Sequence, residues 1–253
     1  MIRIENLDLT LDGAPILRGI DTQIPARGLT AVIGPNGAGK SSLLHCLAGL
    51  VKPGHGRVLI DGTDITIAQP AERARIVALL SQGTPALPRL SVADLVAFAR
   101  WPHHHGRPSP EDERIVRASM DSFDLTPMAQ RRLETLSGGQ RQRAFVAMAH
   151  AQTTPWMLLD EPLAALDPRY ARDIMDRLRT LSRPGPEARS IVVVLHDLAM
   201  AVRCADWIVS LKDGRLVQSA PRSEALTSRN LSNLFDAEIL VDSIRGHPVA
   251  VLA

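Results

Sequence analysis

The chain has 253 residues, 45% hydrophobic and 22% charged, a globular composition that excludes a disordered or collagen-like chain. Its 29 basic and 27 acidic residues leave a net charge of +2, too small to favour a general nucleic-acid binder. Cys46 and Cys204 are too few for a disulfide framework or a zinc cluster. Apolar runs such as 191–195 fall far short of the roughly 18 residues that span a bilayer, and Glu5 and Asp8 stand where a signal peptide would be apolar. We therefore expect a soluble protein of a reducing compartment.

The predicted elements alternate between strands and helices. Apolar alternation or short apolar runs predict strands at 2–11, 16–24, 29–33, 57–60, 156–159, 191–195 and 207–211. Apolar residues at helical spacing predict helices at 40–50, 91–100, 111–123 and 140–152. No strand-like run occurs between residues 84 and 154. The chain thus predicts an α/β core, made of 1–83 and 155–253, that an all-helical insert at 84–154 interrupts.

The short apolar strands of this core predict a parallel sheet, because helices separate them along the chain. Ligands of such sheets bind at the carboxyl ends of the strands. Gly34, Asp160 and His196 directly follow three of the predicted strands. We therefore expect these three positions to lie at one functional edge.

The first of these strand ends begins a phosphate-binding loop of the pattern G-x-x-x-x-G-K-[ST]. It consists of Gly34, Pro35, Asn36, Gly37, Ala38, Gly39, Lys40 and Ser41. The loop lies between an apolar strand and an amphipathic helix, which is the context that the pattern requires. Its glycines allow successive backbone N–H groups to surround phosphates, and Lys40 can reach the β- and γ-phosphates as a compact charge. The hydroxyl of Ser41 can ligate Mg²⁺.

The second strand end carries two adjacent carboxylates, Asp160 and Glu161. Consecutive strand residues point to opposite sides, so we expect Asp160 to act at Mg²⁺-bound water and Glu161 to act as general base on an attacking water. His196 can hydrogen-bond the γ-phosphate or that water. Gln82, at the start of the insert, can contact Mg²⁺. This combination favours hydrolysis over transfer to a second substrate.

A third motif, Leu136-Ser137-Gly138-Gly139-Gln140, opens a predicted helix. Ser137 and Gln140 have the spacing of a capping box. Two glycines right after the cap are costly for a helix that needs only capping, and they suit the close approach of another molecule. The same helix start directs free N–H groups at an anion.

Six motifs occur in order: the phosphate loop, Gln82, the 136–140 signature, the carboxylates at 160–161, Ala165-Leu166-Asp167 and His196. By them the chain resembles the ATP-binding subunits of ABC transporters over essentially its whole length. The resemblance implies a P-loop NTPase core with an N-terminal antiparallel β subdomain and an inserted all-helical subdomain. It implies ATP and Mg²⁺ as cofactors, with ATP bound by the phosphate loop and the adjoining Ser42. Mg²⁺ would be held by Ser41, Gln82 and, through water, Asp160, with Glu161, His196 and Gln82 as catalytic residues.

The resemblance also implies partners. Two copies would pair head to tail around two ATP molecules, so that Ser137 and Gly139 of the signature, which includes Gly138 and Gln140, contact the γ-phosphate bound to the other copy. Asp167 would link the two sites. The insert and the region after Gln82 would receive a membrane permease at the cytoplasmic face of the inner membrane, supplied by a periplasmic or lipid-anchored substrate-binding protein. No nucleic-acid partner is implied.

Within the family, segments 98–103, 139–145, 194–198 and 204–206 look like those of bacterial importers for iron(III)–siderophore, haem or cobalamin. Dicitrate-iron and hydroxamate-siderophore systems look closest. An iron-chelate importer is the first hypothesis, a haem or cobalamin importer the second, and an exporter the nearest rival. Three other classes fit less well. An ATPase of DNA repair would usually need a long coiled-coil or zinc-bearing insertion, for which the chain has no room, and a translation ATPase would usually carry two cassettes in one chain. A phosphotransferase with the same phosphate loop would lack the signature.

Two residue choices complete this reading. Leu11 stands where relatives usually carry an aromatic that stacks on adenine, which predicts loose selectivity for the base. Only three of the 29 basic residues are lysines, and Lys40 is one of them. A lysine retained in so arginine-rich a chain suits a position that arginine cannot fill.

Overall fold

The computed structural model describes residues 1–83, 89–164 and 166–253. Within them, a central sheet has the strand order β10-β9-β3-β8-β7-β6. Its strands are β3 Leu29–Ile33, β6 Val77–Leu80, β7 Trp156–Asp160, β8 Ser190–Val194, β9 Trp207–Lys212 and β10 Arg215–Pro221. They pair in parallel except β10, which is antiparallel to β9. The predicted parallel sheet is confirmed, and its carboxyl edge carries the ends of β3, β7 and β8.

A second, antiparallel sheet is built from the N-terminal part of the chain. It has the order β2-β1-β4-β5 and comprises β1 Ile2–Leu11, β2 Ala14–Ile24, β4 His55–Ile60 and β5 Thr63–Asp64. The expected N-terminal antiparallel β subdomain is therefore present. A separate C-terminal hairpin joins β11 Ile239–Ile244 to β12 His247–Leu252.

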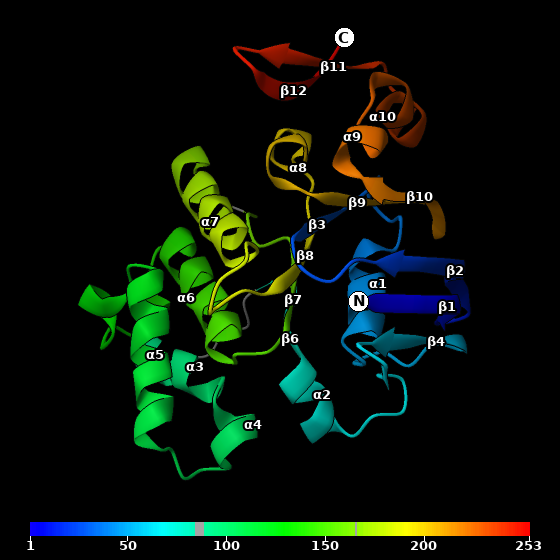
Figure 1. Ribbon diagram of the computed structural model, residues 1–253. Coiled ribbons are helices and arrows are strands. Elements are labelled where there is room, and N and C mark those ends of the chain that lie inside the picture. Colours follow the sequence, from blue (N-terminus) through cyan, green and yellow to red (C-terminus); the bar gives the residue numbers. More distant parts are fainter. Residues whose placement is uncertain (84–88, 165) are drawn as a thin grey trace.

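The helices cover both faces of the central sheet (Figure 1). Their bounds are α1 Lys40–Leu47, α2 Pro70–Ile76, α3 Val92–Phe98, α4 Trp101–His104, α5 Pro110–Ser122, α6 Gly138–Ala151, α7 Pro168–Leu181, α8 Leu198–Cys204, α9 Arg222–Ala225 and α10 Ser228–Phe235. Short 3₁₀ turns lie at Thr126–Met128 and Leu133–Thr135. None of the helices of the described residues has the length and apolarity needed to cross a membrane.

The central sheet separates two apolar cores because its side chains alternate between its faces. On β7, Met157 and Leu159 pack with the insert helices and with α7 and α8. Trp156 and Leu158 point the other way, toward α1 and the N-terminal sheet. The two groups of elements lie on opposite sides of the central strands (Figure 1).

Several boundaries differ from the sequence prediction. The helix predicted over 40–50 ends at Leu47, because Gly49 adopts a φ of 67°, and Leu50 is 65% exposed and not on the buried face. The strand β6 and the C-terminal hairpin were not predicted. Asp160 is the last residue of β7 itself, and Leu195 lies between the end of β8 and His196.

Candidate active site

The phosphate loop joins β3 to α1 in a path that requires glycine. Gly34 has a φ of 150°, and a Cβ there would lie 2.0 Å from the carbonyl oxygen of Leu211 on the neighbouring strand β9. Gly37 and Gly39 have φ values of 77° and 93°. Gly39 is also the N-cap of α1 and offers no side chain to its free N–H groups. The loop thus presents backbone donors at a helix N-terminus, which is an anion site.

Lys40 lies inside this loop rather than in solvent, with only 5% of its surface exposed. Its Nζ donates to the carbonyl oxygens of Gly34 at 2.9 Å and Pro35 at 2.8 Å. Burial lowers the pKa of Lys40, and the nearby negative charges of Glu161 and Asp160 oppose that shift. The loop therefore holds the Lys40 ammonium in place, and a phosphate bound by the same loop would lie beside this charge. Asn36, Ala38 and Ser42 complete the segment; Ala38 N–H closes a turn on Pro35.

Asp160 lies beside Ser41 at the base of the loop. The Ser41 hydroxyl donates to Asp160 Oδ1 at 3.0 Å. The second oxygen, Oδ2, is buried and has no hydrogen-bond partner among the described residues. Burial raises the pKa of Asp160, while the bond from Ser41 opposes the shift. A hydroxyl and a buried carboxylate with a free oxygen form the oxygen-only donor set that a hard cation takes.

Glu161 contacts residues from both neighbouring strand ends. Its Oε2 accepts a hydrogen bond from Gln82 Nε2 at 2.9 Å, and its Oε1 lies 2.5 Å from His196 Nε2. Glu161 has a φ of 49°, in the left-handed region that non-glycine residues uncommonly adopt. The two adjacent acids have different partners in the structure. One carboxylate faces Ser41, and the other lies between an amide and an imidazole.

The signature begins α6, away from this edge. The predicted capping box is present: Gln140 N–H donates to Ser137 Oγ at 3.3 Å, and Ser137 N–H donates to Gln140 Oε1 at 3.1 Å. Ser137 and Gly138 are exposed, and a Cβ at Gly138 would meet nothing within 4 Å. Among the described residues, no hydrogen bond joins 137–140 to the phosphate loop or to Glu161. A single chain therefore brings together the loop, Gln82, Asp160, Glu161 and His196, but not the signature.

The remaining predicted residue, Asp167, is the exposed N-cap of α7. Ala165 of the same motif lies outside the described residues. Sequence reasoning missed Leu211, whose carbonyl lies against Gly34, and Tyr170, which packs on Gly139. Leu211 could have been found from its position near the end of β9, which pairs with β3, the strand before the phosphate loop. Nothing in the local sequence indicates the contact of Tyr170.

Fold and site together define a P-loop NTPase whose carboxylates and histidine suit hydrolysis. Residues 17–164 match the family model described as ABC transporter. The petrobactin import ATP-binding protein YclP of Bacillus subtilis strain 168 is 35% identical over 251 residues, covering 99% of each chain. The chain therefore belongs to the ABC transporter family, as an ATPase.

Solved structures agree with this assignment. An inward-facing metal-chelate type ABC transporter contains a chain with a TM-score of 0.85 and 25% identity, covering 100% of this chain and 97% of that one. An ATP-binding cassette solved as a dimer in a post-hydrolysis state, with ADP and phosphate, has a TM-score of 0.79 and 26% identity. The match covers 88% of this chain and 99% of the cassette. The predicted fold class is confirmed.

Proposed function

We propose that this chain hydrolyses Mg·ATP as a head-to-tail dimer and thereby energises import of an iron(III)–siderophore or related iron chelate through a separate membrane permease. The observation that carries the hydrolysis is the Glu161 carboxylate, which contacts Gln82 and His196 beside the phosphate loop. The full-length similarity to a petrobactin import protein supports the cargo class.

Each site residue has a role that follows from its chemistry. The loop N–H groups and Lys40 bind the phosphates of ATP. Ser41, Asp160 and Gln82 are proposed to hold Mg²⁺, which neutralises charge on the β- and γ-phosphates when bound. The unpartnered Oδ2 of Asp160 fits this group, since it has an acceptor to spare. Glu161 accepts a proton from the attacking water, and His196 orients the water or the γ-phosphate.

The dimer completes the site. The signature residues cannot contact ATP bound by their own chain if they stay apart from its phosphate loop. A second copy placed head to tail would bring its own signature to that ATP, through Ser137, Gly138, Gly139 and Gln140. The exposed start of α6 carries no acidic residue in its first turn, so its N–H groups and helix dipole keep their attraction for a phosphate. Asp167, exposed at the start of α7, is proposed to link the two sites. The cassette dimer with ADP and phosphate supports this arrangement.

A groove beside Gln82 is proposed to receive the permease. It has a volume of about 260 Å³ and includes Leu50, Arg73, Ser81 and Gln152 in its lining. Leu50 is 65% exposed, as a contact residue for an apolar partner would be. The groove lies between the proposed core, residues 1–83 and 155–253, and the proposed insert, residues 84–154. The chain would thus act at the cytoplasmic face of the membrane, downstream of a substrate-binding protein.

Glu161→Gln tests the hydrolytic step. Removing the general base is expected to lower turnover about 10²- to 10⁴-fold while ATP binding persists and the closed dimer accumulates. Glu224→Gln makes the same chemical change on α9 and serves as the control. Sustained normal hydrolysis by Glu161→Gln would contradict the mechanism.

The cargo needs a transport assay. The tagged chain can be purified from membranes together with its permease, and the complex reconstituted in vesicles with its substrate-binding protein. We expect ATP-driven uptake of a ⁵⁵Fe-labelled siderophore, which Glu161→Gln abolishes. Uptake of haem or cobalamin in its place would correct the cargo and leave the ATPase assignment intact.

A further inference from the structure

The start of the signature helix α6 packs directly on the segment that begins α7. A Cβ at Gly139 would lie 3.2 Å from Leu166 Cδ2 and 3.8 Å from Tyr170 Cδ2. On the same face of α6, the Arg143 guanidinium lies over the Tyr170 ring, 5.1 Å from its centroid. Gly139 therefore also has a packing partner inside the chain, because a Cβ there would lie unusually close to the end of the Leu166 side chain.

The Arg143 head group stacks on the Tyr170 ring. Arg143 Nε is buried and has no hydrogen-bond partner among the residues that the structure describes. A guanidinium over an aromatic face is attracted by the ring quadrupole, and more strongly where water is excluded. Tyr170 thus fixes the side chain that follows the signature by one helical turn.

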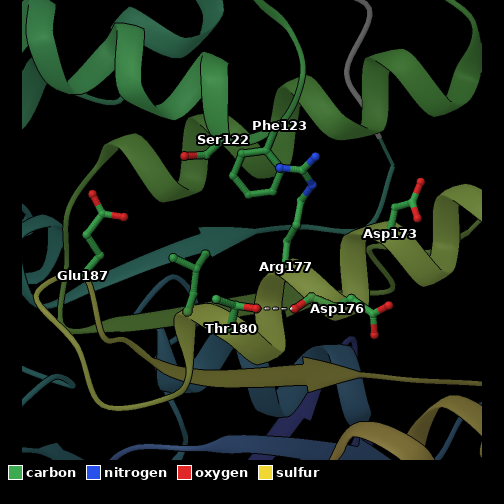
Figure 2. A pocket seen from close by; sticks show the side chains of 8 residues that line it. Ser122, Phe123, Asp173, Asp176, Arg177, Thr180 and Glu187 are labelled. Atoms are coloured by element: carbon green, nitrogen blue, oxygen red, sulfur yellow. Dashed lines mark hydrogen bonds between the residues drawn. The ribbon is translucent and has the colours of Figure 1, made fainter.

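A second arginine joins α7 to the insert further along the same helix. Arg177 forms an ion pair with Asp124, and its guanidinium lies over the Phe123 ring at 5.9 Å from the centroid. Figure 2 shows the Arg177 side chain extending from α7 to Phe123, beside a cavity of about 450 Å³ that Ser122 and Glu187 also line. Tyr170 and Arg177 lie about two turns apart on α7 and so share one face of it. The insert is held to α7 at two points.

We propose that Tyr170 and Arg177 are positioning residues that set the signature, through α7, in register with Asp167. This inference rests on the proposed function, in which the signature meets ATP bound by a second copy. Leu166 and Asp167 directly precede α7, so the contacts that fix α7 against α6 also fix the distance between the signature and the proposed link to the other site. Tyr170 would therefore control the pairing of two ATP-bound copies and not the binding of ATP to one copy.

The experiment uses the full chain carrying Glu161→Gln, which is expected to bind ATP without hydrolysing it. Tyr170→Ala, Tyr170→Phe, Arg177→Ala and, as a matched arginine control, Arg172→Ala are added singly. Arg172 is on α7 as well, but it forms an ion pair with Asp176 of the same helix, with Nε and Oδ2 3.6 Å apart. Binding of a fluorescent ATP analogue to dilute protein reports on the phosphate loop. The ATP concentration for half-maximal dimerisation, measured by size exclusion with light scattering, reports on the signature.

Tyr170→Ala is expected to raise that ATP concentration about tenfold, because both signatures of the dimer lose the contact that positions them. Binding of the ATP analogue should be unchanged. Tyr170→Phe should dimerise like the parent, because phenylalanine retains the ring, and Arg172→Ala should not change dimerisation. Arg177→Ala is expected to shift dimerisation in the same direction, which keeps the test valid if Tyr170→Ala unfolds.

Three results would overturn the inference. Tyr170→Ala and Arg177→Ala could both dimerise like the parent, or Tyr170→Phe could be as impaired as Tyr170→Ala, or analogue binding could fall as much as dimerisation. If the Glu161→Gln parent binds ATP but never dimerises, the proposed head-to-tail function fails, and this inference fails with it. A parent that dimerises normally assigns any failure to the inference alone.

Discussion

Buried charged groups occur in two regions of the chain, the carboxyl edge of the central sheet and the helical insert, and their surroundings differ. At the edge, Asp160 keeps an unpartnered Oδ2 and Glu161 has a left-handed backbone. In the insert, Arg100 donates to Asp112 at 3.0 Å, to the Ala151 carbonyl at 3.0 Å and to Thr153 Oγ1 at 2.6 Å. The Arg100 guanidinium is thus satisfied inside the chain and stabilises the fold, whereas the spare oxygen of Asp160 at the strand edge fits a second molecule.

The same contrast separates helix starts within the insert. α3, α5 and α6 all begin with a capping box. In the first two, a carboxylate at the third helical position, Asp94 or Asp112, accepts from the capping serine and neutralises the helix dipole. In α6 the corresponding residue is the neutral Gln140, after two glycines. The signature is thus the one of these three capping boxes whose third helical residue is uncharged, which fits the proposed contact with a phosphate.

Breaking the insert's ion pair should have the largest effect on stability. Arg100→Ala leaves Asp112, 6% exposed, without its cation, and is expected to lower the free energy of unfolding by about 3–5 kcal/mol. Urea unfolding checks this, with Arg114→Ala as control, since its pair with Glu111 is exposed and worth about 0–1 kcal/mol. Equal losses in both variants would refute the contrast between the regions.

The contribution of Asp112 to stability should also be lost at low pH. Hydrogen bonds from Ser109 and the Arg100 charge hold the pKa of Asp112 far below its usual value. A depressed pKa contributes stability that is present above the unfolded value of about 3.9 and is lost as the pH falls toward the folded value. The stability difference between the wild type and Asp112→Asn should therefore be full at neutral pH and shrink below about pH 4.

At the carboxyl edge of the sheet, Lys40→Ala should affect ligand binding rather than folding. Losing charge-assisted bonds worth about 1.5–3 kcal/mol corresponds to an ATP affinity that is about 10- to 150-fold weaker. Lys40→Arg should restore little, because a planar guanidinium does not fit the place where Nζ lies between the carbonyls of Gly34 and Pro35. Calorimetric titration with ATP measures both variants. Full binding by Lys40→Arg would disprove the special role given to this lysine.

The sequence predicted the features that depend on local pattern and motif. The strand at 29–33 and the capping box of Ser137 both follow from residue spacing. The helix after the phosphate loop was predicted too long, because Gly49 ends it and an apolar Leu50 continues the pattern by chance. Strand β6 was missed, since an apolar run of four residues after a helix cannot be assigned by periodicity.

Long-range packing explains what the sequence could not give. The position of Gln82 next to Glu161 depends on β6 pairing with β7, and local sequence does not determine which strands are neighbours. The contact of Gly139 with Leu166 and Tyr170 likewise depends on where α7 lies against α6. Two glycines in the signature suggested the approach of another molecule. The structure shows that Gly139 also serves packing inside the chain.

A buried histidine in the insert is expected to make a smaller, pH-dependent contribution to the free energy of unfolding. Burial, with the nearby charge of Arg189, lowers the pKa of His150, whose Nδ1 lies 2.9 Å from the Ser119 hydroxyl. The neutral ring is thus favoured in the fold, so its contribution is full above the unfolded pKa of about 6.5 and falls as the pH drops below it. His150→Asn can keep the bond to Ser119 and should cost about 1 kcal/mol at pH 7.5.

Urea titrations of the wild type and His150→Asn at pH 7.5 and 5.5 test this. The difference in unfolding free energy should be smaller at pH 5.5, because only the wild type must bury a group that gains a proton on unfolding. A difference that grows on acidification would show that His150 is protonated in the fold.

The smallest expected effect concerns the base of the nucleotide. Leu11 lies at the end of β1, 40% exposed, and offers apolar contact without an aromatic face. Hydrolysis of GTP should therefore approach that of ATP in the wild type. Leu11→Tyr should gain stacking worth about 0.5–1.5 kcal/mol, which corresponds to an ATP affinity roughly two- to tenfold higher. Leu50→Tyr, which places the same ring at another exposed leucine position, is the control and should change the affinity for neither ATP nor GTP. Strict ATP preference in the wild type would show that contacts other than Leu11 select the base.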